Sequence, residues 1–397
     1  MSSRPNLFAP DTRANPYPLY AELRRDAPVC QVDPGGFWVL SRYEDVLAAL
    51  KNPQLYSSEG FLLFAEKSWL PSNPLRDTLL SMDPPRHGQM RSLISRAFGA
   101  TAMARIEPLI RSCSEELVAK LPADRPVDFV EAFSMHLPTI VIGTLLGLPV
   151  STYEHFRRWT TDLANIPGVP NDDLAAQART RESWMSMDGY IAEVVEDRRR
   201  NPQDDMVTDL LRVRVDGESL PSTVLRGFMN LLLVAGLETT VHLLTLCIKA
   251  LAEHPDALAL LLADRSRVPA FIEEVLRYHA PAQAVLRITT AEVELHGIRL
   301  PPGSPMLPLI ASANRDPSRF TEPERFDITR TGTNNMPFGH GAHFCLGAAL
   351  ARMEARIAIE KLLNRFQRFE VTTDRIEWNY SLTVRGPWVM PVTLHEA

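Results

Sequence analysis

The residue whose surroundings most clearly favour chemistry is Cys345, in the segment 338–347, which reads FGHGAHFCLG. Glycine adopts positive φ and has no Cβ, so the glycines of this segment would let the backbone lie close to a flat group. A helical pattern follows Cys345 directly, and a thiol at a helix N-terminus gains from the helix dipole and from free backbone N–H groups. A thiolate on a glycine-rich turn is what an axial haem ligand requires.

The same segment resembles the Phe-Gly-x-Gly-x-His-x-Cys-x-Gly signature of the cytochrome P-450 superfamily, the haem–thiolate monooxygenases. Six specified residues over ten positions make a sharper signal than a lone glycine fingerprint. The resemblance implies haem b (iron protoporphyrin IX) as cofactor, O2 as co-substrate and Cys345 as the iron ligand. It also implies that Phe338, Gly339 and Gly347 contact the haem. The alternative is a buried, inert cysteine that closes a loop.

Basic residues in three separate segments could bind the two carboxylates of a haem. His87 and Arg91 lie four residues apart on a predicted helix that starts at Asp83-Pro84-Pro85, with a cap residue followed by proline in the first turn. The resemblance adds Arg287, in a predicted short strand, and His343, two residues before the cysteine. It assigns all four side chains to the haem propionates. Taken alone, a His–Arg pair at this spacing would more often be a solvated helix face.

A long apolar segment, 221–253, predicts one helix of roughly 50 Å that is buried nearly all round. Its middle, 235–240, reads AGLETT, where glycine and β-branched residues weaken a helix and a buried carboxylate costs free energy. Such a local conflict suggests function. The six residues resemble the family's oxygen-activation motif, with Glu in place of the commoner Asp. The resemblance implies that Ala235 contacts the haem and that Glu238 and Thr239 deliver protons to the oxygen. The alternative is a solvent-facing acid at a kink.

Three charged residues resemble an ion-pair triad of the family that supports the haem from the cysteine side. Glu274 and Arg277 lie on one face of a predicted helix, 270–278, and Arg325 follows in a loop. We assign these residues to structure and not to chemistry.

The substrate pocket is predicted from segments that the family places around the haem. Segment 57–81 is long, irregular and apolar, which is typical of a functional loop, and 381–386 reads as a hairpin that enters the pocket in relatives. The predicted pocket residues are Phe61, Phe64, Leu231, Val234, Ala235, Gln283, Val285 and Leu382. Their apolar character suggests a terpenoid, steroid, fatty acid or polyketide substrate. The alternative is that each of these residues belongs to the ordinary hydrophobic core.

Composition limits the classes of protein that remain. The 397 residues are 45% hydrophobic, which is ample for a core of this size, and the net charge of −6 implies no nucleic-acid partner. Four scattered cysteines without a CxxC pair argue against a zinc site and for a reducing compartment. The N-terminus lacks a signal-peptide pattern, and no apolar run reaches the ~18 residues of a membrane span. We therefore expect a cytoplasmic protein of soluble bacterial type, without a membrane anchor and monomeric.

The predicted fold is mainly α with small β-sheets, the cytochrome P-450 fold, as a single large domain over residues 1–397. Helices are expected at 18–26, 43–52, 102–120, 133–146 and 152–162, with a lid at 165–173 before a helix that runs towards residue 200. The resemblance implies hydroxylation, epoxidation or dealkylation of the substrate. Electrons would come from a ferredoxin or flavodoxin with an NAD(P)H reductase, docking near Arg96, Arg352 and Arg356. A peroxide-driven peroxygenase and a non-enzymatic haem sensor are the alternatives.

Overall fold

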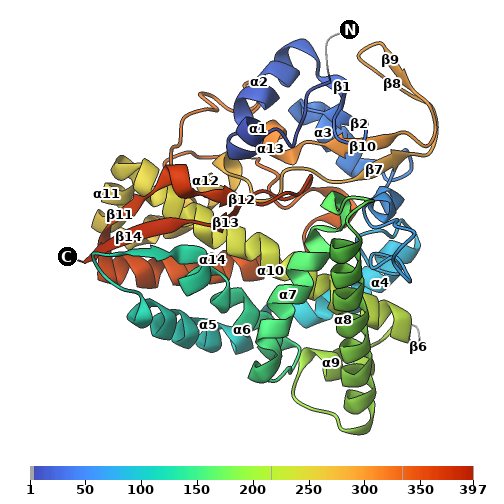
Figure 1. Cartoon of the computed structure of the whole chain (residues 1–397), viewed down its shortest axis with the longest axis horizontal. Coiled ribbons are helices and arrows are strands. Elements are labelled where there is room, and N and C mark those ends of the chain that lie inside the picture. The colour runs from blue at the N-terminus through green and yellow to red at the C-terminus, as the bar shows by residue number, and fades with distance from the viewer. Residues whose placement is uncertain (1–3, 216, 333, 397) are drawn as a thin grey trace.

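The computed structural model describes residues 4–215, 217–332 and 334–396. Helices form most of the fold, and small sheets lie along its edges (Figure 1). The α-helices are α1 (Pro10–Ala14), α2 (Tyr17–Asp26), α3 (Tyr43–Lys51), α4 (Arg86–Ser95), α5 (Ala100–Lys120), α6 (His136–Leu145), α7 (Tyr153–Ala164), α8 (Leu174–Arg200), α9 (Met206–Arg212), α10 (Ser222–Glu253), α11 (Pro255–Ala263), α12 (Val268–Tyr278), α13 (Ile310–Ala313) and α14 (Ala348–Arg365). The strands are β1 (Val29–Val32), β2 (Phe37–Leu40), β3 (Tyr56–Ser57), β4 (Pro126–Asp128), β5 (Arg214–Val215), β6 (Glu218–Ser219), β7 (Arg287–Thr289), β8 (Val293–Leu295), β9 (Ile298–Leu300), β10 (Pro305–Pro308), β11 (Phe366–Val371), β12 (Glu377–Trp378), β13 (Pro387–Val389) and β14 (Pro391–Glu396).

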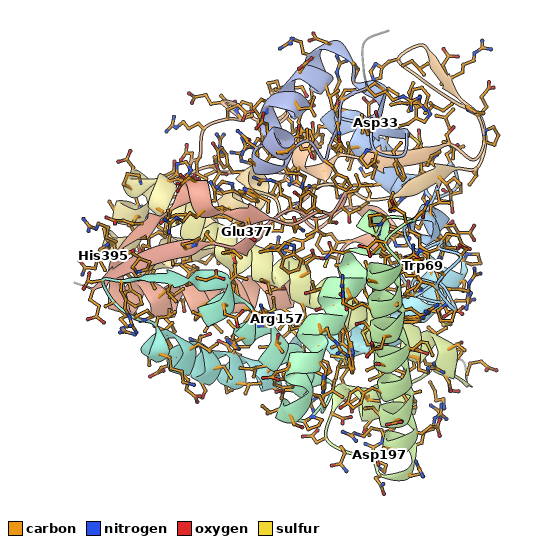
Figure 2. All side chains as sticks on the ribbon, viewed as in Figure 1. Asp33, Trp69, Arg157, Asp197, Glu377 and His395 are labelled. Carbon is orange, nitrogen blue, oxygen red and sulfur yellow. The ribbon has the colours of Figure 1, made fainter. Side chains whose placement is uncertain are left out.

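The predicted architecture is confirmed: helices dominate, the sheets are small, and the predicted helices and the first hairpin form within a few residues of their expected bounds. Side chains fill the space between the ribbons (Figure 2). In that view Asp197, near the C-terminal end of α8, and His395, in β14, lie at two edges of the molecule.

Helix α10 crosses the middle of the molecule and contacts α6, α7, α8, α12 and α14 (Figure 1). Its length and apolar composition would suffice to span a membrane, yet 67% of its most apolar window is buried inside the protein. The core of the fold therefore accounts for its hydrophobicity. The expectation that α10 is buried nearly all round is wrong in the middle of the helix, where Ala235 is exposed and Leu231 and Thr239 are only partly buried.

The two threonines in the middle of α10 bond to the backbone of their own helix. Thr239 Oγ1 donates to Ala235 O at 2.8 Å, and Thr240 Oγ1 donates to Gly236 O at 2.9 Å. These bonds to carbonyls one turn earlier occupy the threonine side chains without ending the helix. Ile142 of α6 packs against Gly236, where a Cβ would lie 3.2 Å from the Ile142 side chain. The glycine thus permits close helix packing at the point where the opposite face of α10 is open.

The largest sheet joins segments that are far apart in the sequence, in the strand order β1-β2-β10-β7-β3. Strand β10 runs parallel to β2, with Met306 opposite Trp38 and Leu307 opposite Val39. Strand β7 begins with Arg287, which pairs with Met306 of β10, so the sheet fixes the position of this arginine. A second sheet has the order β11-β14-β4 and packs near the C-terminal end of α14. The segment 381–386, expected as a hairpin, lies in the loop between the paired strands β12 and β13.

The predicted cap of α4 is wrong. The N-cap is Pro85, and the Asp83 carboxylate accepts hydrogen bonds from the Ser57 hydroxyl and, at 2.9 Å, from Ser58 N. The acid is therefore used to hold the start of η1 (Ser58–Phe64) against the start of α4.

The predicted ion-pair triad is right in two members and wrong in the third. Arg277 forms two hydrogen bonds of 2.8 Å with the Glu274 carboxylate, and both side chains are buried. The further guanidinium belongs to Arg330, whose Nε lies 3.3 Å from Glu274 Oε1. Arg325 contributes only its carbonyl, which accepts from Arg277 at 3.0 Å, while its side chain points out and pairs with Glu322.

Candidate haem-binding active site

The cysteine loop is closed by backbone bonds and needs glycine at one position. Cys345 N donates to Phe338 O at 2.9 Å, and α14 begins three residues later with Gly347 as its N-cap. Gly341 has a φ of 70°, and a Cβ there would lie 2.8 Å from Leu50 O. Positive φ and this close approach to α3 both exclude a larger residue. The loop is thus held as a tight turn that presents Cys345.

The side chain of Cys345 is exposed, and it lines an internal cavity. Protein atoms packed on its other sides raise the pKa of the thiol by burial, an effect that outweighs the opposing N–H groups of Gly347 and Ala348 and the charges of Arg91 and Arg352. The helix terminus alone therefore does not make the thiolate, contrary to expectation. A metal ion bound to the sulfur would produce the thiolate, since coordination ionises a thiol outright.

The cavity has a volume of about 300 Å³ and lies between α10 and the cysteine loop. It brings together most of the residues that the sequence predicted for the cofactor and the pocket. Predicted residues that line it are Phe61, His87, Arg91, Leu231, Ala235, Thr239, Val285, Arg287, Phe338, Gly339, His343, Cys345 and Gly347. Ala235 and Thr239 come from the open stretch of α10, and Cys345 comes from the loop before α14.

Four basic side chains converge at one side of this cavity. The His87 and His343 rings lie 4.0 Å apart, and His343 Nε2 is 2.9 Å from Ser58 Oγ. Burial, followed by the charges of His87, Arg287 and Arg91, lowers the pKa of His343 to about 3. Burial lowers the pKa of Arg287 to about 10, with Asp83 opposing the shift.

This basic cluster fits a dianion. His87 is 2% exposed, and its Nε2 has no hydrogen-bond partner among the described residues. Depressed pKa values and an unpaired donor in a buried basic cluster are relieved when an anion binds there. The two carboxylates of a porphyrin would do so, and Cys345, which lines the same cavity, would be available to its iron. The residues present therefore fit an iron porphyrin with thiolate ligation.

Glu238 does not line the cavity, unlike its neighbour Thr239. Its Oε1 accepts from Asn379 Nδ2 at 3.0 Å, and Arg13 Nη2 donates to Asn379 Oδ1 at 2.7 Å. His242 Nε2 lies 3.5 Å from the same Glu238 oxygen. His242 is fully buried, and neither ring nitrogen has a hydrogen-bond partner within the part of the chain that the structure describes. The acid therefore sits in a polar network behind α10.

Several residues predicted for the pocket lie elsewhere in the described structure. Gln283 is buried, accepts from Tyr20 OH at 3.0 Å and donates to Ala280 O at 2.6 Å, so its amide is used in the core. Leu382 and Val234 are not among the residues that line the cavity, and they pack in the hydrophobic cluster under the N-terminal helices and against the main core, respectively. The side chain of Phe64 lies outside the described residues.

Sequence reasoning missed some residues around the site. Glu354 of α14 lines the cavity and is 1% exposed, and burial raises the pKa of its carboxyl to about 8. Its spacing from Cys345 along a helical pattern could have indicated it. Asn379 and Arg13 gave no such signal, because each contacts the Glu238 network only through long-range folding.

Comparison with known proteins assigns the family. The sequence model of cytochrome P-450 matches residues 11–383. Vitamin D(3) 25-hydroxylase of Pseudonocardia autotrophica is 36% identical over 396 residues, covering 98% of this chain and 96% of the relative. Cytochrome P-450 CYP109Q5 from Chondromyces apiculatus superposes with a TM-score of 0.92 at 37% identity, covering all of both chains. CYP109E1 from Bacillus megaterium, solved with corticosterone, superposes with a TM-score of 0.84 at 32% identity, covering 96% of this chain and 99% of that chain. The protein is a member of the cytochrome P-450 family, the haem-dependent monooxygenases.

Proposed function

We propose that the protein inserts one oxygen atom into a largely hydrophobic small molecule of steroid or secosteroid type. The observation that carries the proposal is the placement of Cys345 and the Ala235–Thr239 face of α10 around one cavity. The family uses haem b and O2. Since Cys345 would hold the iron from the loop, the substrate would be held on the α10 side of the cavity.

The lining of the cavity supports an apolar substrate. Away from the basic cluster it is formed mostly by aliphatic and aromatic side chains, among them Phe61, Leu79, Leu80, Phe98, Phe228, Leu231 and Val285. Apolar walls with few polar groups select ligands by shape and hydrophobic area. Relatives were solved with a fatty-acyl carrier protein and with erythromycin B as well as with corticosterone. We place the steroid class first because the relative that matches 98% of this chain is a vitamin D(3) 25-hydroxylase.

The positions of the site residues support the following roles. Haem b held by Cys345 would supply the activation and cleavage of O2. His87, Arg91, Arg287 and His343 would bind the propionates. Phe338, Gly339 and Gly347 would pack against the porphyrin.

Protons would be delivered from the α10 side of the cavity. Thr239 lines the cavity and its hydroxyl donates to Ala235 O at 2.8 Å, and release of this bond would let the hydroxyl donate into the cavity instead. Glu238, one residue earlier, would exchange protons between its polar network and Thr239 through water or a change of rotamer. Ala235 would leave room for oxygen and substrate because its side chain is small.

We further propose that the protein works as a monomer in the cytoplasm and receives electrons from a ferredoxin or flavodoxin with an NAD(P)H reductase. The cationic side chains Arg96, Arg352 and Arg356 on the cysteine side would steer such an acidic partner. Hydroxylation is the expected reaction on a saturated carbon, and epoxidation or dealkylation would follow from a different atom held at the same place.

The first test is spectroscopic. Steroids and secosteroids titrated into the haem-loaded protein should shift the iron to high spin, whereas fatty acids should not. Cys345→Ala should abolish the red-shifted Soret band of the ferrous–CO form. Persistence of that band in Cys345→Ala would refute the ligand assignment.

A second test separates the peroxide-driven alternative. Turnover with NADPH, ferredoxin and reductase is compared with turnover driven by hydrogen peroxide. We expect product chiefly in the first case. Equal or better turnover with peroxide alone would support a peroxygenase.

A further inference from the structure

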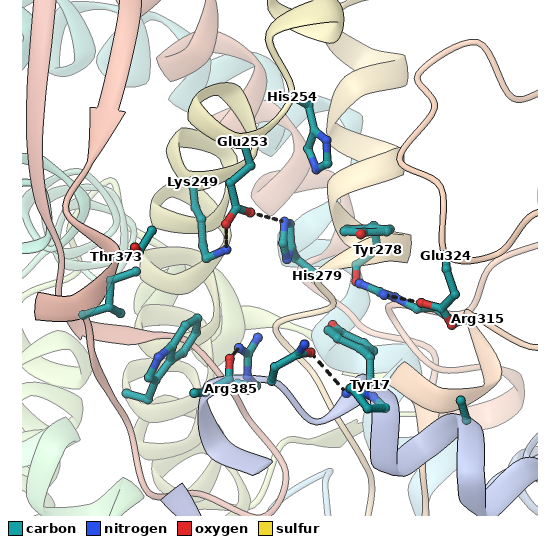
Figure 3. Close-up of a pocket in the computed structure, with 16 residues that line it drawn as sticks. Tyr17, Lys249, Glu253, His254, Tyr278, His279, Arg315, Glu324, Thr373 and Arg385 are labelled. Carbon is teal, nitrogen blue, oxygen red and sulfur yellow. Dashed lines mark hydrogen bonds and ion pairs between the residues drawn. The ribbon is translucent and has the colours of Figure 1, made fainter. Parts of the chain in front are cut away.

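A second cavity, of about 790 Å³, shares no lining residue with the haem cavity. It lies where the C-terminal ends of α10 and α12 meet the segment before α2 and the segment before β13. Figure 3 shows Lys249, His279 and Arg385 around the same space, with Tyr17 and Arg315 on its other side. Nothing in the proposed monooxygenase mechanism uses these residues.

The charges around this cavity do not balance. Lys249 pairs with Glu253, and Arg315 Nη1 lies 2.6 Å from Glu324 Oε2. Arg385 is the third cation, and the ion pairs found among the described residues include none with Arg385. The cavity thus carries one buried positive charge in excess of its acids.

Arg385 also has an unused hydrogen-bond donor. The residue is 3% exposed, its Nε donates to Arg13 O at 2.9 Å, and its guanidinium stacks on Trp378 at 3.8 Å. Its Nη2 donates to Ala14 O, but Nη1 has no partner in the described part of the chain. Buried polar groups are nearly always hydrogen-bonded, so an unpartnered guanidinium nitrogen beside a cavity points to an occupant that accepts.

Two imidazoles face the same region without hydrogen bonds. Nε2 of His254 and Nε2 of His279 are buried and have no partner among the described residues. His279 Nε2 lies 3.8 Å from Glu253 Oε2, and donor atoms of these three residues lie within 4.8 Å of one another. This spacing would also suit a divalent metal ion.

The surrounding charges decide against a metal ion. Burial, and after it the charges of Lys249, Arg315 and Arg385, lowers the pKa of His279 well below its usual value. The same positive charges would repel a divalent cation at this place and attract an anion. An anion would in addition accept from Arg385 Nη1, which a metal ion cannot do.

We propose that this cavity binds an oxyanion, the phosphate or carboxylate group of a small molecule, through Arg385 Nη1, the Lys249 ammonium group and the His279 imidazole. Lys249 keeps its bond to Glu253 and has two further N–H groups to donate. The volume of about 790 Å³ is far larger than a free phosphate ion requires, so the group can belong to an organic molecule.

The proposal is tested by calorimetric titration of the haem-loaded full-length protein with inorganic phosphate, adenosine monophosphate and citrate in separate experiments. We expect binding of at least one, and Lys249→Gln should weaken it about tenfold or more, as for loss of a charge-assisted hydrogen bond. Comparison of phosphate with the nucleotide distinguishes a free ion from a phosphate ester. Comparison of both with citrate distinguishes phosphate from carboxylate.

Lys249→Gln is the main variant because Arg385 also supports Arg13, which contacts the Glu238 network through Asn379. Arg385→Gln should abolish binding as well, and its folding is checked by its Soret spectrum and its melting temperature. Lys361→Gln is the matched control, since Lys361 forms a similar lysine–glutamate pair with Glu115 at the surface. It should bind each anion as the wild type does.

Two outcomes would overturn the proposal. The first is that none of the three anions binds, or that each binds Lys249→Gln and the wild type equally. The second is that Co²⁺ binds with a visible d–d spectrum that His279→Gln removes, while the anions do not bind. That result would make the cavity a metal site.

Discussion

Asn379 Nδ2 donates a hydrogen bond to Glu238 Oε1 at 3.0 Å, so the acid of α10 is held by a residue of the C-terminal segment. Arg13, from the N-terminal helix α1, donates to the other end of the same amide. The acid next to Thr239 is thus tied to two distant parts of the chain and does not face the haem cavity. A proton that passes from Glu238 to Thr239 requires an intervening water molecule or a rotation of the carboxylate.

This arrangement predicts different effects for the two neighbours. Thr239→Ala should keep haem and substrate binding but release more hydrogen peroxide per NADPH, because a positioned hydrogen bond at the cavity is lost. Glu238→Gln should instead lower kcat about tenfold to a hundredfold and change its solvent isotope effect, since only proton supply is impaired. Product, peroxide and NADPH are measured together in each variant. Equal product per NADPH in Thr239→Ala and wild type would contradict the role of Thr239.

The corrected ion-pair triad predicts a stability difference between two arginines. Arg330→Met should lower the free energy of unfolding by about 3 kcal/mol, because it removes a partner from the buried Glu274–Arg277 pair. Arg325→Met should change it by less than about 0.5 kcal/mol, because that side chain is 58% exposed. Urea unfolding followed by circular dichroism gives both values. A larger loss in Arg325→Met would restore the triad expected from the sequence.

Glu354 predicts a pH dependence of stability. Burial raises the pKa of this carboxyl from 4.5 to about 8, so between these values the folded state holds a proton that the unfolded state releases. Stability from this group is fully present below pH 4.5 and declines by up to about 1.4 kcal/mol per pH unit as the pH rises to about 8. Glu354→Gln should flatten this slope, whereas Glu360→Gln on the same helix should not. The prediction is checked by measuring the free energy of unfolding of each variant between pH 4.5 and about 8. An unchanged slope in Glu354→Gln would exclude a protonated Glu354.

The face that we propose for partner docking is less basic than the sequence suggests. Arg352 Nε lies 2.5 Å from Glu273 Oε1, and Arg356 pairs with Glu360 and Glu107, whereas Arg96 is exposed. Arg352→Glu should slow reduction by a ferredoxin and weaken its decline with salt, since attraction to an acidic partner is lost. Glu273→Gln should do the opposite, because it leaves the Arg352 charge unpaired. Stopped-flow reduction across ionic strengths measures both. A rate that neither variant nor salt alters would place the docking face elsewhere.

Local patterns in the sequence were enough to predict the cysteine loop, the long helix and the basic residues. The positions of Cys345 and Gly341 follow from the needs of a tight turn, and the bounds of α10 follow from one long apolar run. His87 and Arg91 share a helix face because of their spacing alone. These features depend on backbone geometry within a few residues, which a linear sequence specifies.

Tertiary structure decided which side chains meet across long distances. The third member of the ion-pair triad is Arg330 and not Arg325, because the loop turns the Arg325 side chain outwards and its carbonyl inwards. The Gln283 side chain accepts a hydrogen bond from Tyr20, 263 residues earlier, and therefore lies in the core and does not line the cavity. Periodicity defines the faces of a single helix or strand, whereas the partner of each face depends on how distant segments pack. That is why the sequence by itself determined the family, the cysteine loop and α10, and only the folded chain decided the surroundings of Glu238 and the second cavity.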